Sequence, residues 1–287
     1  MGAEEYHRLK EYAETRFSEL SKIFQDEIRV LTEYEELICL VTIILGSYPP
    51  RDITDRSIRD LLADVFDFLY ISRRLILEGY ASTAFPLLRR AFESISLIHY
   101  FMLLPNKAIV WDKGKQLSNA GIRKYLNSHP MGESEKAMKD LYAFFSGATH
   151  PNREYIPTRF LGEKNQFVLG AIGLPNLLVL ADYIHRLIEL WFWFGALISY
   201  YYRDLLSSVD KNYGDNYMKI ANEAKRVSEE LLKSQRELWE KERGREAKPA
   251  SNTACMLRAC ALALRNTSLS ANTVYAGKVM RPCGVNG

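Results

Sequence analysis

The stretch from Gly79 to Pro105 is apolar almost all the way round a helix. At 100° per residue, one face collects six apolar side chains: Ala84, Leu88, Ala91, Ile95, Ile98 and Met102. The polar residues share one narrow strip, which consists of Arg89, Glu93, Ser96 and Tyr100. A helix with so little polar surface is expected inside a bundle. Its polar strip must find partners there, because unpaired polar groups are costly to bury.

The same helical period recurs along most of the chain. It predicts one or two helices over residues 4–47, a helix from about 52 to 78, and a long helix from 175 to about 207. Asp52 or Thr54 can cap the helix that ends at 78, and Gly79 supplies its stop. Between 105 and 175 we expect short helices near 108–111 and 119–126, a helix over 135–147, and a β-hairpin over 158–172 that turns at 163–165.

The segment from 212 to 245 is highly charged and carries a heptad-like seam. Its apolar positions between Tyr213 and Leu238 alternate at spacings of four and three. Such a seam indicates either a coiled-coil arm that recruits a protein partner or a solvated helix that lies against the body of the protein. The whole pattern predicts an all-α fold, a bundle of four or five long helices with a small β-hairpin insertion and a C-terminal helical, coiled-coil-like extension.

Composition divides the chain into four segments. These are an N-terminal helical segment at 1–50, a bundle at 51–207, a charged helical arm at 208–248 and an atypical tail at 249–287. The tail has no acidic residue, no clear period and three of the four cysteines, so we expect it to be disordered and to contribute little to stability. With Cys39 alone in the rest of the chain, the sequence offers neither a disulfide framework nor a cysteine zinc site.

Charge and hydropathy exclude several classes of protein. The formal net charge is +3, but the tail carries +4, which leaves −1 for residues 1–250. Bulk charge therefore does not indicate polyanion binding. The most apolar run, Leu190–Tyr202, is too short to span a bilayer, and the N-terminus is unlike a signal peptide, so we expect a cytoplasmic protein without membrane contact. The aromatic residues of this run exceed what one helix face buries in a monomer, which predicts a homo-oligomer, most simply a dimer.

Two polar constellations are candidates for chemistry. Arg89 and Glu93 stand four residues apart on the central helix, and Tyr142, Ser146 and His150 repeat at the same spacing on the helix predicted over 135–147. Joining the two polar edges would satisfy both, so we expect these helices to pack together. His150 could then act as general acid or base, with Arg89 steadying phosphate charge and Ser146 orienting the substrate. Equally, Arg89 and Glu93 could be a buried structural pair and His150 a cap of the helix end.

These motifs resemble an uncharacterised bacterial all-helical family. The similarity rests on L-L-R-x-x-x-E at 87–93 and Y-x-x-x-S-x-x-x-H-P at 142–151, covers about 52–203 and extends in layout to HEPN domains. It implies a module of a bacterial defence or toxin–antitoxin system and a metal-independent ribonuclease that takes RNA as its partner. HEPN ribonucleases use an R-x(4–6)-H motif, and here the one such spacing is Arg123–His129, which is expected by chance. The alternative is a non-enzymatic interaction or sensor module with a structural Arg-Glu-Ser-His cluster.

The sequence does not favour a metal or an organic cofactor. Di-iron bundles need two E-x-x-H motifs and two further glutamates, whereas the chain offers Glu4-x-x-His7 near its N-terminus and Asp182-x-x-His185. We interpret Asp182 and His185, like Tyr142, as supporting residues of the site. The chain has no Gly-rich phosphate loop and no H-E-x-x-H motif. We therefore expect neither a metal nor a cofactor.

Overall fold

The structure is a computed structural model that describes residues 2–132, 135–149, 160–161, 166–167 and 177–245. The described residues form helices joined by loops, together with one pair of two-residue strands, which confirms the all-α prediction. No helix in these ranges is long and apolar enough to cross a membrane. The helices are α1 (Gly2–Ile23), α2 (Gln25–Gly46), α3 (Ile53–Leu77), α4 (Ala81–Leu103), α5 (Pro105–Asp112), α6 (Asn119–Ser128), α7 (Glu135–Thr149), α8 (Leu177–Tyr201), α9 (Arg203–Val209) and α10 (Tyr213–Arg245).

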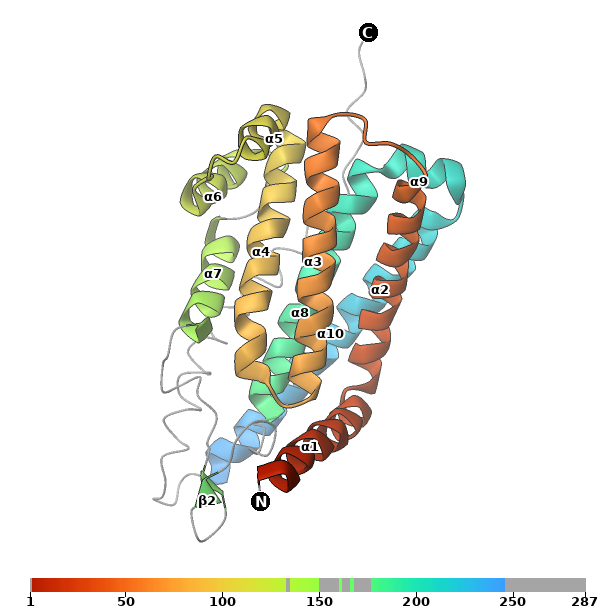
Figure 1. The fold of residues 1–287 in the computed structure, drawn as a ribbon. Coiled ribbons are helices and arrows are strands. Elements are labelled where there is room, and N and C mark those ends of the chain that lie inside the picture. The colour runs from red at the N-terminus through yellow and green to blue at the C-terminus, as the bar shows by residue number, and fades with distance from the viewer. Residues whose placement is uncertain (1, 133–134, 150–159, 162–165, 168–176, 246–287) are drawn as a thin grey trace.

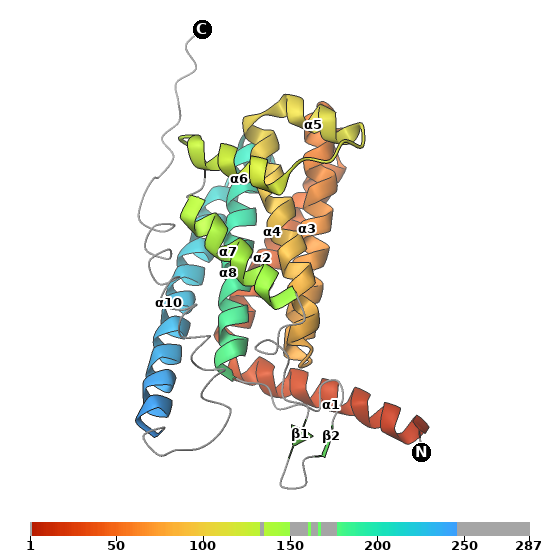
Figure 2. The same cartoon turned by 90° about the vertical axis from the view of Figure 1, so that its left-hand side faces the viewer.

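Five long helices, α2, α3, α4, α8 and α10, lie side by side and form the bundle (Figure 1). The predicted central helix is α4, which contacts α3, α5, α6, α7 and α8. Helix α1 lies across one end of the bundle and extends beyond it, while α5 and α6 lie at the opposite end (Figure 2). One hydrophobic cluster runs through the bundle from Leu20 to Leu231. The segment boundaries predicted at 50 and 207 therefore fall inside a single core.

Local sequence chemistry explains the turn that places α3 beside α4. Helix α3 begins where the Asp52 carboxylate accepts a hydrogen bond of 2.7 Å from the Asp55 amide, as an N-cap. It ends at Leu77, and Gly79 two residues later has a φ of +88° that other residues rarely adopt. The amides of Gly79 and Tyr80 then donate to the carbonyls of Ile76 and Leu75, at 3.1 and 2.7 Å. This Schellman turn reverses the chain, so α4 packs back along α3.

The segment predicted as a hairpin is described at four residues only. Strand β1 (Phe160–Leu161) pairs antiparallel with β2 (Gln166–Phe167), and Phe160 lies opposite Phe167. The predicted turn at 163–165 and the rest of 158–172 lie outside the described residues. The predicted tail at 249–287 also lies outside them.

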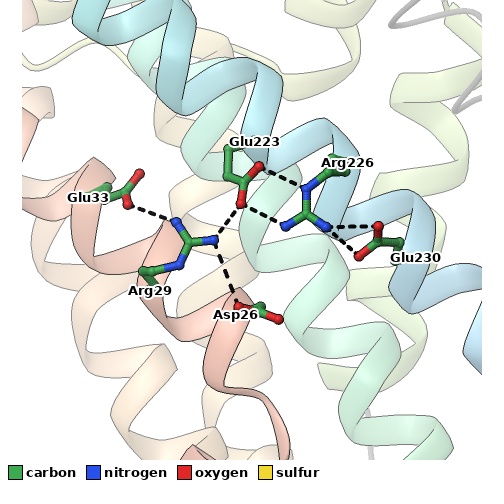
Figure 3. Close-up of polar contacts among 6 residues, drawn as sticks. All are labelled: Asp26, Arg29, Glu33, Glu223, Arg226 and Glu230. Carbon is green, nitrogen blue, oxygen red and sulfur yellow. Dashed lines mark hydrogen bonds and ion pairs between the residues drawn. The ribbon is translucent and has the colours of Figure 1, made fainter.

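Helix α10 packs against α8 and α2, so the second alternative for the charged segment, a helix against the body, is the arrangement that the structure shows. The seam of α10 is buried within the chain, at Tyr213, Ala224, Val227 and Leu231. An ion-pair network on the surface joins α10 to α2 (Figure 3). In it, Arg29 of α2 binds Asp26, Glu33 and Glu223, while Arg226 of α10 binds Glu223 and Glu230.

The aromatic run of α8 that led to the dimer prediction is partly buried within one chain and partly at its surface, where Tyr200 is 47% exposed. Trp191, Phe194 and Tyr202 are buried within one chain, where Phe66 of α3 packs edge-on against Trp191 at a ring-centroid distance of 5.7 Å. Helix α8 is surrounded by α2, α3, α4 and α10, which all contact it. The oligomeric state therefore stays a prediction.

Candidate functional site

The polar strip of α4 meets α7, as the spacing of Arg89 and Tyr142 predicts. Arg89 donates from Nη2 to the Tyr142 hydroxyl at 2.9 Å and from Nε to Glu93 Oε1 at 3.1 Å. The pair of helices is brought together by apolar side chains on either side, since Phe92 of α4 lies 6.0 Å from Phe145 of α7 between ring centroids. The Arg89–Glu93 pair is thus tied to the second helix through the Tyr142 hydroxyl.

A second arginine reaches the same tyrosine from α6. The Arg123 guanidinium carbon lies 4.1 Å from the centroid of the Tyr142 ring, and that of Arg89 lies 5.0 Å from it. Both distances are within the range of cation–π contacts. Arg89, Glu93, Arg123 and Tyr142 therefore form one cluster contributed by three helices, which we call the arginine–tyrosine site.

Sequence reasoning missed Arg123 as a member of this site. Its spacing from His129 was interpreted as chance, and the structure gives the two residues different surroundings. His129 follows the last residue of α6, stacks on Tyr125 at a centroid distance of 5.8 Å and accepts a hydrogen bond of 3.2 Å from the Met131 amide. The sequence feature that could have indicated this contact is an arginine on a short amphipathic helix, α6, which precedes the helix that carries Tyr142.

The arginine–tyrosine site carries a net positive charge at the edge of the bundle. The cluster contains two guanidinium groups and one carboxylate, which gives it a formal charge of +1. The side chains of Arg89 and Glu93 are 27% and 17% exposed, so the site is partly desolvated but still open to solvent. The Tyr142 hydroxyl accepts from Arg89 and keeps its own proton for donation. Planar guanidinium donors and one hydroxyl proton suit an oxyanion such as a phosphate.

The described contacts of the arginine–tyrosine site do not include Ser146 or His150, the other two residues proposed for catalysis. Ser146 lies in α7, one turn beyond Tyr142, but its side chain is outside the described part of the chain. His150, which follows the last residue of α7, lies wholly outside it. The roles of Ser146 and His150 remain predictions.

The supporting residues Asp182 and His185 belong to a second cluster, centred on Arg186 of α8. Arg186 donates from Nη1 to Glu189 at 2.7 Å, and its Nε lies 3.7 Å from Asp182. His185 lies 3.4 Å from Glu189 through Nε2 and 2.5 Å from the Ser228 hydroxyl of α10 through Nδ1. We call Asp182, His185, Arg186, Glu189 and Ser228 the α8 network. His185, Arg186 and Ser228 are buried, and the side chains of Asp182 and Glu189 are 16% and 15% exposed.

Charges in the α8 network are set by burial and by Arg186. Burial opposes the ionised form of Glu189, but Arg186 and His185 outweigh it and lower the Glu189 pKa to about 2. Burial dominates at Asp182 and raises its pKa, although Arg186 acts against it. Glu189 is therefore the carboxylate that balances the Arg186 charge.

The α8 network is best explained as a structural lock. Ser228, His185 and Glu189 lie in a row that resembles a catalytic relay, but Ser228 is 1% exposed and gives a substrate no access. Among the residues that the structure describes, no group of three His, Cys, Asp or Glu side chains could hold a metal ion. The arginine–tyrosine site is therefore the stronger candidate for binding.

A comparison of the chain with family models, with curated proteins and with solved structures found no match. The resemblance to HEPN domains accordingly rests on the motifs at 87–93 and 142–151 alone and stays a prediction.

Proposed function

We propose that the protein is a HEPN-like helical module that binds RNA and cleaves it without a metal ion. The observation that supports this proposal is the meeting of two guanidinium groups, Arg89 and Arg123, on one partly exposed tyrosine. Proteins use paired arginines of this kind for phosphate, because their donors match its oxygens. A setting in bacterial defence or a toxin–antitoxin pair is what the motif resemblance implies.

The dimensions of α7 suggest how binding and cleavage are divided. Thr149 ends α7 seven residues after Tyr142, which is about 10 Å along the helix axis. We propose that the strand runs along α7, with one phosphate at the arginine–tyrosine site and a neighbouring one at His150. His150 then serves as general acid or base, and Ser146 orients the strand.

This proposal is tested with labelled single-stranded RNA in the presence of EDTA. The intact protein should produce fragments, and His150→Ala should abolish them while leaving RNA affinity within about twofold, because the residue moves a proton and does not anchor the strand. Arg123→Gln should weaken binding by about tenfold, in line with one lost charged contact to phosphate. Arg203→Gln, an exposed arginine on α9, is the matched control and should change neither. Equal cleavage by His150→Ala would contradict the catalytic assignment.

The alternative, a non-enzymatic interaction or sensor module, is favoured by one specific observation. Two donor atoms of Arg89 are already engaged by Glu93 and Tyr142, as in a closed structural cluster. Glu93→Gln separates the two functions. If Arg89 binds phosphate, removing the carboxylate frees a donor and should strengthen RNA binding. If the cluster only locks α4 to α7, the variant should lose stability and leave RNA affinity unchanged.

A further inference from the structure

The end of the bundle formed by α5 and α6 is strongly basic, although the chain as a whole is not. Residues 105–132 contain five basic residues and one acidic residue, a formal charge of +4. The acidic residue, Asp112, is engaged by Arg56 of α3, with 2.5 Å between Oδ1 and Nη2. The net charge of −1 for residues 1–250 therefore does not show this local positive charge, because acidic residues elsewhere balance it.

The lysines of this end are exposed to solvent. Lys107, Lys113, Lys115 and Lys124 are all exposed, and within the described ranges no carboxylate lies at ion-pair distance from any of them. Helices α5 and α6 and the loop between them lie together over one end of the bundle (Figures 1 and 2). We call these four lysines, with Arg123, the basic cap. A surface of one charge sign without counter-charges attracts a polyanion.

Helix α6 links the basic cap to the arginine–tyrosine site. Lys124 belongs to the cap, and the preceding residue, Arg123, lies on the ring of Tyr142. Tyr125 and His129 of the same helix stack with an interplanar angle of 30°, and both are partly exposed. Lysines for phosphates and partly exposed rings for bases are the two components of single-strand binding surfaces.

We infer that the basic cap is the surface through which the protein takes up single-stranded RNA and guides it to the arginine–tyrosine site. This inference rests on the proposed function and names the path of its substrate. Charge complementarity would also suit an acidic protein segment. Two features favour RNA: the stacked rings of Tyr125 and His129, and the continuity through Arg123 to the arginine–tyrosine site. An acidic peptide has neither bases that stack on the rings nor phosphates that the site would bind.

The test compares two triple variants with the same change in net charge. The cap variant removes three of the five positive charges of the basic cap, by Lys113→Gln, Lys115→Gln and Lys124→Gln. The control variant removes three positive charges of exposed lysines elsewhere, by Lys22→Gln, Lys211→Gln and Lys219→Gln. Fluorescence anisotropy measures the affinity of the full chain for a labelled 12-nucleotide RNA over a range of salt concentrations. Neutralising the cap should weaken binding by about tenfold or more and reduce the salt slope by about 2, since each phosphate contact contributes about 0.7 for single strands. The control triple should stay within about twofold of the unmodified protein.

The possible failures are distinguishable. If the unmodified protein binds RNA and Arg123→Gln weakens it, but the cap variant binds normally, the cap inference is overturned and the proposed function stands. If the unmodified protein does not bind RNA, both are overturned. If polyglutamate of equal charge displaces the RNA at equal concentration, the cap is a surface for acidic protein segments and the RNA assignment is wrong. Equal losses in the two triple variants would show a bulk charge effect and would also overturn the inference.

Discussion

The Ser228 hydroxyl on α10 lies 2.5 Å from Nδ1 of His185 on α8, with both side chains buried. The other ring nitrogen of His185, Nε2, lies 3.4 Å from Glu189 Oε1, so the ring is held between a hydroxyl on α10 and a carboxylate on α8. The contact therefore fixes the ring orientation and joins α10 to α8.

Ser228→Ala should lower the free energy of unfolding by about 1–3 kcal/mol, because Nδ1 of His185 would remain buried without a hydrogen-bond partner. Urea denaturation followed by circular dichroism measures the change. Ser18→Ala on the exposed face of α1 is the control and should cost no more than about 0.5 kcal/mol. Equal stabilities of the two variants would mean that Ser228 does not support the network.

Arg186→Met should destabilise the protein by about 3–5 kcal/mol, because it leaves the largely buried carboxyl groups of Glu189 and Asp182, 15% and 16% exposed, without their cation. The same denaturation experiment applies, with exposed Arg226→Met as the control, which should destabilise the protein far less because its ion pairs are screened by solvent. A triple variant with Asp182→Asn, Arg186→Met and Glu189→Gln removes both acidic charges as well and should regain part of the loss. If it regains nothing, packing of the Arg186 side chain and not its charge accounts for the effect.

Two buried groups should give stability opposite dependences on pH. Burial lowers the His99 pKa from 6.5 to about 4, so its contribution is present above pH 6.5 and is lost as the pH falls towards 4. Burial raises the Glu35 pKa from 4.5 to about 7 despite the neighbouring Arg73, so its contribution is present below pH 4.5 and is lost as the pH rises towards 7. Each change is on the order of 3 kcal/mol over its window.

Denaturation of His99→Gln and Glu35→Gln between pH 4 and 8 tests this. The stability advantage of the unmodified protein over His99→Gln should shrink as the pH falls, and its advantage over Glu35→Gln should shrink as the pH rises. In the unmodified protein the two trends offset each other between about pH 4.5 and 6.5. Parallel curves for the protein and a variant would exclude a buried, perturbed group at that position.

Two truncations should behave very differently. Ending the chain at Lys248 should leave the melting temperature nearly unchanged, because the tail lacks the periodicity of a packed segment. Ending it at Asn212 removes α10 and uncovers the side of α8 and α2 that Ala224, Val227 and Leu231 bury, so the product should unfold or aggregate. Differential scanning fluorimetry and size-exclusion chromatography compare the two. A drop of many degrees on ending at Lys248 would show that the tail packs on the body.

Features with a local cause could be predicted from the sequence. The cap at Asp52 and the turn at Gly79 depend on residues within one helical turn, and both appear as expected. The meeting of Arg89 with Tyr142 was also predictable, since each belonged to a narrow polar edge that needed a partner.

Features that depend on what covers a helix were harder to predict. Asp182, Arg186 and Glu189 have the spacings of three and four residues that are typical of a solvated edge, and the sequence does not show that other helices bury Arg186 and largely cover the two acids. The contact of Arg123 with Tyr142 links a charge to a ring on another helix, which no sequence spacing encodes. Likewise, the heptad-like seam of α10 is the same whether its partner is another chain or its own α2 and α8.

The place of α10 in the bundle determines when the protein can finish folding during synthesis. Its Glu223 binds Arg29, a residue 194 positions earlier in the chain. The ribosome releases α2, α3 and α4 long before α10 exists, so the nascent chain exposes the apolar side that α10 later covers. Contacts of such long sequence separation form late. A pause in translation before Tyr213 would therefore hold the chain in its most aggregation-prone form, and chaperone binding should peak at that length.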